Sequence, residues 1–182
     1  MRLYLVRHPQ PSDSIRLCYG RRDVSVAPAM VAEAASAVRE AIPESVLHAA
    51  PIYSSPSSRA LGLARALAAP REPRVDEDLR EMGFGAWEGR AWDDIPRAEI
   101  DAWAGDVWGY RAGGDESAAM VRGRWRRFCT TLRAASPAQE MVAVTHSGVI
   151  RVALVGAGLL SEEGFPRAPI GYASVHRIDV AP

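Results

Sequence analysis

The segment Met141–Thr145 constrains the fold of this chain more than any other feature. It reads Met-Val-Ala-Val-Thr and is apolar almost throughout. A strand that is apolar on both sides is typical of the buried interior of a parallel sheet. His146-Ser147-Gly148 follows directly, and the apolar run from there toward Gly156 predicts a helix. A strand that passes straight into a helix in this way indicates an α/β fold.

Further strands and helices alternate along the rest of the chain. We expect short strands over 3–6 and 50–53, and a strand with one partly exposed face over 173–180. Pro28 suits the first turn of a helix that ends at Ile42. A second helix is expected to be capped by Ser54 or Ser55, to carry Pro56 in its first turn and to end before Pro70.

A third helix is predicted to be capped by Asp115. It places an apolar stripe along one face, which we interpret as core packing, through Val121, Trp125, Phe128 and Leu132. The alternation predicts an α/β three-layer sandwich with a mostly parallel central sheet flanked by helices. In such folds ligands bind at the carboxyl ends of the strands.

The length of 182 residues suits a single domain over 1–182. Residues 86–114 hold most of the tryptophans and several glycines, which favours a helical insertion or lid over a separate domain. Cys18 and Cys129 are too few and too far apart for a disulfide framework or a CxxC motif. The apolar run before Arg7 is too short for a signal peptide, and Arg151 within 141–160 argues against a membrane helix. We therefore expect a cytoplasmic protein without a membrane partner.

The charge composition excludes some classes of binding partner and mechanism. The 22 basic residues are balanced by 22 acidic ones, so no basic excess points to nucleic acid. Every basic residue is arginine, which excludes a Schiff-base lysine and the lysine of a Walker-type phosphate loop.

Two histidines follow the two most apolar strands. Arg7-His8-Pro9 ends the first strand, His146 ends the strand at 141–145, and Arg59 follows the short strand at 50–53. Strand ends meet at one edge of a parallel sheet, so these side chains are expected to converge. Singly, each histidine is more often a satisfied polar residue and each arginine a surface charge. Together, and without metal-ligand spacing, they indicate a pocket for an anion such as phosphate, with no metal and no cofactor.

Five segments resemble the histidine phosphatase superfamily, which includes phosphoglycerate mutases and many small-molecule phosphatases. In chain order they are Arg7-His8-Pro9 (RHG-type), Ser54–Ala60 (SSPLxRA), Leu79–Gly89 (LxExxFGxWEG), Gly113–Ser117 (GGES) and Val144–Arg151 (VxHxGxIR). The resemblance covers nearly the whole chain and implies a phosphoglycerate mutase-like fold.

The resemblance also implies a role for each matching residue. His8 would be the nucleophile and form a phosphohistidine, and a histidine among cations stays neutral near pH 7. The phosphoryl oxygens would be bound by Arg7, Arg59 and His146, with Ser14 near the place of a further polar contact. Glu81 would protonate the leaving alkoxide and then activate water, although alone it is an ordinary glutamate in an acidic run. Glu88 is expected to make a structural bond beneath the site.

Two positions depart from the family pattern. Pro9 stands where the family usually has glycine, which restricts φ and removes one N–H donor. We expect a modified rim and an intact site. Asp115 is an extra residue in the GGES-like segment and leaves the roles of Glu116 and Ser117 open, with Glu116 the next acid–base candidate after Glu81.

The segment Cys18–Val24 is similar to the CYGxxDV segment of α-ribazole phosphatases of cobalamin biosynthesis. This likeness implies that the substrate is α-ribazole 5′-phosphate. We expect a metal-independent phosphomonoesterase whose partner is a small-molecule phosphate ester, and the protein is expected to be a monomer or homodimer. Trp92, Trp103 or Trp108 would stack on the base or else pack the lid. Two alternatives remain open: a broad-specificity small-molecule phosphatase, and a catalytically silent phosphoryl-ligand binding protein.

Overall fold

Strand β1 (Arg2–Arg7) lies parallel to β4 (Glu140–Thr145), with Arg7 opposite Thr145. This register brings His8 and His146, which follow the two strands, to the same edge of the sheet. The computed structural model describes residues 1–12, 17–135 and 139–180. Within them a five-stranded sheet has the order β3-β2-β4-β1-β5. Its other members are β2 (Ile52–Ser54), β3 (Arg74–Val75) and the antiparallel edge strand β5 (Val175–Asp179).

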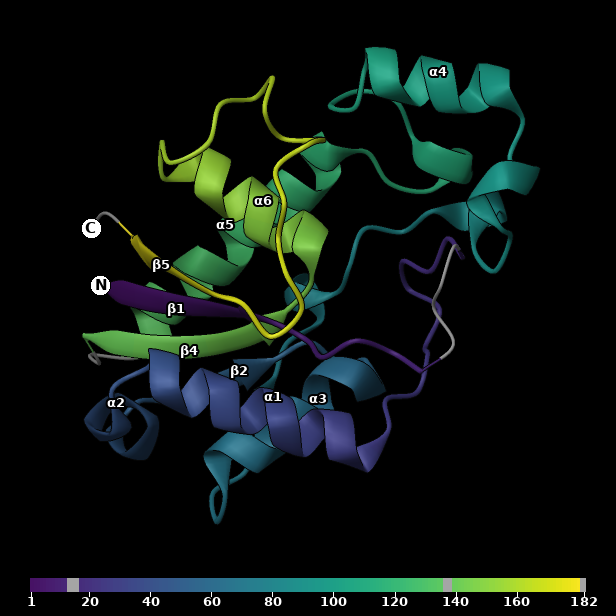
Figure 1. Cartoon of the computed structure of the whole chain (residues 1–182). Coiled ribbons are helices and arrows are strands. Elements are labelled where there is room, and N and C mark those ends of the chain that lie inside the picture. The colour runs from purple at the N-terminus through teal and green to yellow at the C-terminus, as the bar shows by residue number, and fades with distance from the viewer. Residues whose placement is uncertain (13–16, 136–138, 181–182) are drawn as a thin grey trace.

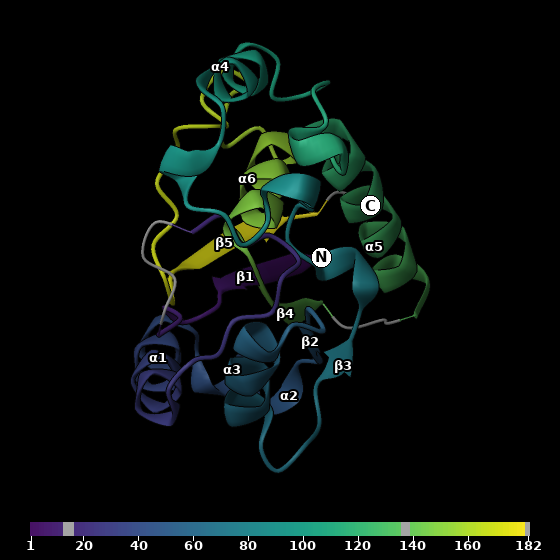
Figure 2. The same cartoon turned by 90° about the vertical axis from the view of Figure 1, so that its right-hand side faces the viewer.

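Helices cover both faces of the sheet (Figures 1 and 2). One face carries α1 (Pro28–Ala41), α2 (Glu44–Ala49) and α3 (Ser58–Ala68), and the other carries α5 (Ala118–Ala135) and α6 (Ser147–Gly156). Alternate residues of β1 point into two cores: Leu3 and Leu5 pack on the α5–α6 side, whereas Tyr4 and Val6 pack on the α1–α3 side. The predicted α/β sandwich with a mostly parallel sheet is confirmed.

Two helices begin later than the sequence predicts. The helix expected to be capped by Ser54 or Ser55 begins at Ser58, because Ser54 still belongs to β2 and its hydroxyl donates to the Ser55 carbonyl oxygen (2.8 Å). The helix expected to be capped by Asp115 begins at Ala118, and the Ser117 hydroxyl oxygen accepts a hydrogen bond from the Met120 N–H (3.4 Å). Both capping predictions were wrong, because Ser54 belongs to a strand and Asp115 follows the 3-10 turn Ala112–Gly114. Pro56 was expected in the first turn of the second helix but precedes that helix.

Two short elements, α2 and β3, were not predicted at all. Strand β3 has two exposed residues and therefore carries no apolar pattern. Strand β5 is shorter at both ends than the expected 173–180, and β2 begins and ends later than 50–53. None of the helices in the described ranges is both long and apolar enough to cross a bilayer.

Residues 86–114 combine short helical turns with irregular loops and lie beyond the carboxyl ends of the strands (Figure 1). They contain α4 (Arg97–Gly105) and the short 3-10 turns Trp92–Asp94 and Ala112–Gly114. Trp87, Ile95 and Ala112 of this segment form a small apolar cluster together with Cys18, which lies outside it. The role of this segment as a lid stays a prediction.

Candidate active site

His8 lies at the end of β1 and is 2% exposed. Its backbone N–H donates to the Thr145 carbonyl oxygen (3.0 Å), which extends the β1–β4 ladder by one bond. The ring atom Nδ1 lies 2.6 Å from the carbonyl oxygen of Pro9. A carbonyl oxygen only accepts, so Nδ1 carries the proton and Nε2 keeps the lone pair. Burial, followed by the charges of Arg59 and Arg7, lowers the pKa of His8 to about 3. The imidazole is therefore neutral and its Nε2 is available as a nucleophile.

His146 follows β4 and faces His8, with the ring centroids 5.0 Å apart. Its Nε2 lies within hydrogen-bond distance of the hydroxyls of Ser55 (2.8 Å) and Ser57 (3.2 Å). Within the described part of the chain its buried Nδ1 has no partner. Burial, followed by the neighbouring His8 and Arg59, holds the pKa of His146 well below its usual value. Ser55, which was expected to cap a helix, and Ser57, which directly precedes α3, thus orient this histidine.

Arg59, in the first turn of α3, is 1% exposed. Its guanidinium donates to the carbonyl oxygens of Gly20 (2.6 Å) and Arg22 (2.9 Å). The turn that carries these carbonyls is held by Glu88, which accepts from the backbone N–H groups of Arg21 (2.8 Å), Arg22 and Phe84 (3.0 Å). Glu88 therefore acts structurally beneath Arg59, as the sequence predicted.

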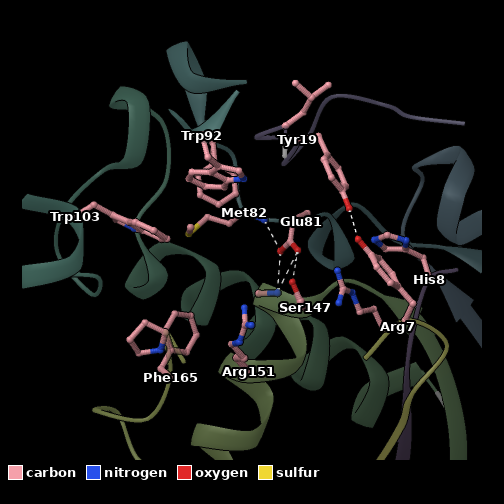
Figure 3. A pocket seen from close by; sticks show the side chains of 15 residues that line it. Arg7, His8, Tyr19, Glu81, Met82, Trp92, Trp103, Ser147, Arg151 and Phe165 are labelled. Carbon is pink, nitrogen blue, oxygen red and sulfur yellow. Dashed lines mark hydrogen bonds between the residues drawn. The ribbon is translucent and has the colours of Figure 1, made fainter. Parts of the chain in front are cut away.

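Glu81 lies at the amino end of α6 and is 9% exposed. Its carboxylate accepts hydrogen bonds from the N–H groups of Met82 (2.9 Å) and Gly148 (3.1 and 3.2 Å) and from the Ser147 hydroxyl (3.2 Å). A Cβ at position 148 would lie 2.4 Å from Glu81 Oε1, so only glycine permits this approach. Figure 3 shows the carboxylate facing the pocket that Arg7 and His8 also line.

Arg7, His8 and Glu81 border a cavity of about 340 Å³ with two unlike ends, whereas the buried side chains of Arg59 and His146 lie behind its lining. The polar end contains Arg7, His8, Glu81, Ser147, Arg151 and two tyrosines, Tyr19 and Tyr172. Figure 3 shows Met82, Trp92, Trp103 and Phe165 at the other, apolar end, and Leu17 and Phe84 also line the cavity. The arrangement places a neutral imidazole and a carboxylate around one cavity, with arginines beside them and an apolar wall at the other end.

The structure places the predicted residues as follows. It brings Arg7, His8, Arg59, Glu81 and His146 together at the strand ends. Ser14 lies outside the described residues. Glu116 is buried away from the cavity lining, where it accepts from Gly83 N–H (3.0 Å) and pairs with Arg124 (3.2 Å) and Arg21 (2.9 Å). No cluster of three or more histidine, cysteine, aspartate or glutamate side chains suited to a metal occurs in the described ranges.

Residues 3–182 match the model of the histidine phosphatase superfamily (branch 1). The chain belongs to this superfamily. A protein of Hydrogenobacter thermophilus named "Putative phosphoserine phosphatase 2" is 32% identical over 167 residues, which is 87% of this chain and 80% of that protein. The chain is therefore a phosphatase of the histidine phosphatase type.

Solved structures agree with this assignment. A mycobacterial glucosyl-3-phosphoglycerate phosphatase, solved with VO3, is 26% identical with a TM-score of 0.79 and covers 97% of this chain and 91% of its own. The α-ribazole phosphatase of Shigella flexneri is 23% identical, has a TM-score of 0.79, and covers 100% of this chain and 91% of its own. At that identity the second likeness shows the fold alone.

Arg151 and Tyr172 line the pocket of this histidine phosphatase and were not among the sequence candidates. Arg151 is one turn after Ser147 on α6, and its guanidinium points into the pocket (Figure 3) while its Nε donates to the Ala168 carbonyl oxygen (2.8 Å). The spacing of four residues on a helix could have revealed it. Tyr172 lies on the loop before β5, where no periodicity gives a signal.

The three tryptophans considered as base-stacking residues lie in different places. Trp92 and Trp103 line the cavity and stack on each other, with ring centroids 6.1 Å apart. Trp108 packs against Phe165 (4.8 Å between centroids) and is not among the lining residues. Of the three, only Trp92 and Trp103 are therefore exposed to the cavity of this histidine phosphatase.

Proposed function

We propose that this histidine phosphatase hydrolyses small-molecule phosphomonoesters, without a metal, through a phosphohistidine on His8. The observation that carries the proposal is the hydrogen bond of the His8 Nδ1–H to the Pro9 carbonyl oxygen (2.6 Å). It directs the lone pair to Nε2, and the lowered pKa keeps that lone pair unprotonated at neutral pH. A nucleophile in this state needs no separate base to attack phosphorus.

The surrounding groups take the remaining roles in this proposal. Arg7, Arg59 and His146 bind the phosphoryl oxygens and stabilise the charge that redistributes during transfer. Ser14 is proposed as a further contact on the sequence likeness alone. Glu81 protonates the leaving oxygen and then accepts a proton from the water that attacks the phosphohistidine. The arginines supply the positive charge that a divalent ion would otherwise provide.

For the substrate we propose α-ribazole 5′-phosphate of cobalamin biosynthesis. The likeness of Cys18–Val24 to the CYGxxDV segment supports this choice, and so does the apolar end of the cavity. A flat base attached to the leaving ribose would meet Trp92 and Trp103, and stacking on aromatic rings stabilises bases by about 1–3 kcal/mol in other proteins. We further propose that the enzyme is cytoplasmic and acts as a monomer or homodimer. Cys18 and Cys129 are both buried free thiols.

A second candidate is a broader phosphatase for small phosphates whose alcohol carries an acidic group. The guanidinium of Arg151, which points into the pocket, favours it because arginine is well suited to binding a carboxylate. The phosphoserine phosphatase named for the Hydrogenobacter thermophilus relative gives a concrete test substrate.

The test is a panel of phosphoesters assayed with purified protein in EDTA, including α-ribazole 5′-phosphate, phosphoserine and p-nitrophenyl phosphate. We expect hydrolysis in EDTA, inhibition by vanadate, and label from ³²P-substrate that is acid-labile and alkali-stable. His8→Ala should lose both activity and label. Full activity in His8→Ala would refute the phosphohistidine proposal. Dependence of the activity on added magnesium would refute metal independence. Vanadate binding without turnover of any phosphoester would favour the catalytically silent binding protein.

A further inference from the structure

Two tyrosines at the polar end of the cavity have no part in the mechanism proposed above. The Tyr172 hydroxyl lies 2.8 Å from the Tyr19 hydroxyl, although the residues are 153 positions apart in the chain. The Tyr172 ring covers the Arg7 guanidinium (3.8 Å from Cζ to the ring centroid) and lies 5.7 Å from the His8 ring. The Tyr19 ring lies 5.4 Å from the Arg59 guanidinium. The pair therefore spans the two arginines that are proposed to bind phosphate.

The loop that carries Tyr172 is fastened to the catalytic strand. Arg7 donates through its backbone N–H to the Ser174 carbonyl oxygen (3.1 Å) and through Nη1 to that of Ile170 (2.5 Å). The Ala173 N–H donates to the His8 carbonyl oxygen (3.4 Å). Ala173 has a φ of +54°, in the left-handed region that alanine adopts only where its surroundings impose it. The position of Tyr172 is thus fixed by the same residues that form the phosphoryl site.

The hydroxyl of Tyr172 can donate a hydrogen bond to a ligand in addition to its contact with Tyr19. Each phenol has one O–H to donate and lone pairs to accept. If Tyr19 donates to Tyr172, the O–H of Tyr172 is left to donate to a third group, and a donor that also accepts is polarised and strengthened. Pro9, next to His8, has no N–H, so the backbone supplies one donor fewer at this point than a glycine would. A phosphoryl group held between Arg7 and His8 would offer an acceptor beside Tyr172, because the Tyr172 ring lies next to both residues.

We propose that Tyr172 is a phosphoryl-binding residue whose hydroxyl donates to a phosphoryl oxygen, and that Tyr19 positions that hydroxyl. The assignment rests on the proposed function, because it presumes that the phosphoryl group is bound at Arg7 and His8. It predicts a contact to the transferred group itself, in contrast to the leaving-group contact of Glu81.

The test compares Tyr172→Phe with the unaltered enzyme. The variant keeps the ring on Arg7 and removes only the hydroxyl. A hydrogen bond to a charged group contributes enough that we expect kcat/KM to fall by about 10-fold or more, and the dissociation constant of orthovanadate to rise by a similar factor. The loss should be equal for p-nitrophenyl phosphate and for an alkyl phosphate. Tyr4→Phe is the matched control, because the Tyr4 hydroxyl donates to Glu140 (3.2 Å) at the start of β4, at the end of the sheet away from His8.

Tyr19→Phe distinguishes a positioning role from a structural one. We expect a smaller loss, about 3-fold, and a double variant no worse than Tyr172→Phe alone, because Tyr19 acts through Tyr172. An additive double variant would overturn the role of Tyr19. Vanadate affinity and kcat/KM of Tyr172→Phe within twofold of the unaltered enzyme would overturn the role of Tyr172. Calorimetric vanadate binding tests the contact even if no substrate turns over, and absence of both turnover and vanadate binding would overturn the proposed function as well.

Discussion

Replacing Glu81 with glutamine separates acid–base catalysis from binding, because the structure accommodates the amide. The carboxylate accepts from Met82 N–H, from Gly148 N–H at both oxygens, and from the Ser147 hydroxyl. In Glu81→Gln the remaining oxygen can keep the two backbone donors. The new NH2 group can donate to the Ser147 oxygen, since a hydroxyl both donates and accepts. We therefore expect the folded structure to be retained, with a stability change of about 1 kcal/mol or less.

The loss of rate should depend on the leaving group. General acid catalysis contributes about 10²–10⁴-fold, which corresponds to about 3–5 kcal/mol of transition-state free energy. An alkyl phosphate such as α-ribazole 5′-phosphate needs the proton, because its leaving alkoxide is a poor one. We expect kcat for that substrate to fall within this range, whereas the phosphorylation step with p-nitrophenyl phosphate should change little. KM should stay level or fall, because a negative charge beside the phosphate has been removed.

Rapid-quench kinetics provide the second readout. If Glu81 also activates water, the variant should release a burst of p-nitrophenol followed by slow turnover, as phosphohistidine accumulates. The control is Glu77→Gln, the same substitution at an exposed residue that pairs with Arg80 outside the pocket. An equal loss for both substrates without a burst would show that Glu81 only positions other groups. Glu116 could not replace it without leaving its buried contacts with Arg124 and Gly83.

Two further predictions concern the same site. Gly148→Ala places a Cβ 2.4 Å from Glu81 Oε1, so the carboxylate must move. We expect a folded protein, as judged by thermal unfolding, whose kcat on alkyl phosphates is reduced at least about 10-fold; unchanged kinetics would contradict the role given to this contact. His8 and His146 both have a lowered pKa in the folded state, so below the unfolded value of about 6.5 the unfolded chain binds more protons. The free energy of unfolding should therefore decrease as pH falls from about 6.5 toward 3, by up to about 1.4 kcal/mol per histidine per pH unit. Urea titrations at several pH values should show a shallower pH dependence of this free energy in His8→Gln, and the same pH dependence in the variant would refute the argument.

The sequence predicted the central sheet well because its strands are defined by burial. Strands β1 and β4 are apolar on both faces, and each was located to within a residue or two. Strand β3 and helix α2 could not be found in the same way. Arg74 and Val75 are exposed and pair with β2 only because the chain returns to the sheet edge there. That pairing is a property of the assembled sheet and not of the two residues.

The site residues divide along the same line. His8 and His146 were expected to meet because they follow buried parallel strands, and the register of β1 on β4 brings them together. Glu81 sits in an acidic run, and its position depends on Ser147 and Gly148, which are more than sixty residues away in the chain. Only the family resemblance singled it out. Tyr172 had neither signal, because its place depends on loop contacts with Arg7 and His8.

Pro9 shows how a departure from a family pattern can alter a site without removing its chemistry. Proline at position 9 has no backbone N–H, so this donor is lost, as the sequence alone indicates. The backbone carbonyl of Pro9 still accepts a hydrogen bond, since its oxygen lies 2.6 Å from Nδ1 of His8. The ring restricts φ at this buried residue, so the carbonyl has less freedom to turn away from the imidazole. Loss of the donor is then the reason that a side-chain hydroxyl is useful at the phosphoryl group, and Tyr172 is held where it could donate one.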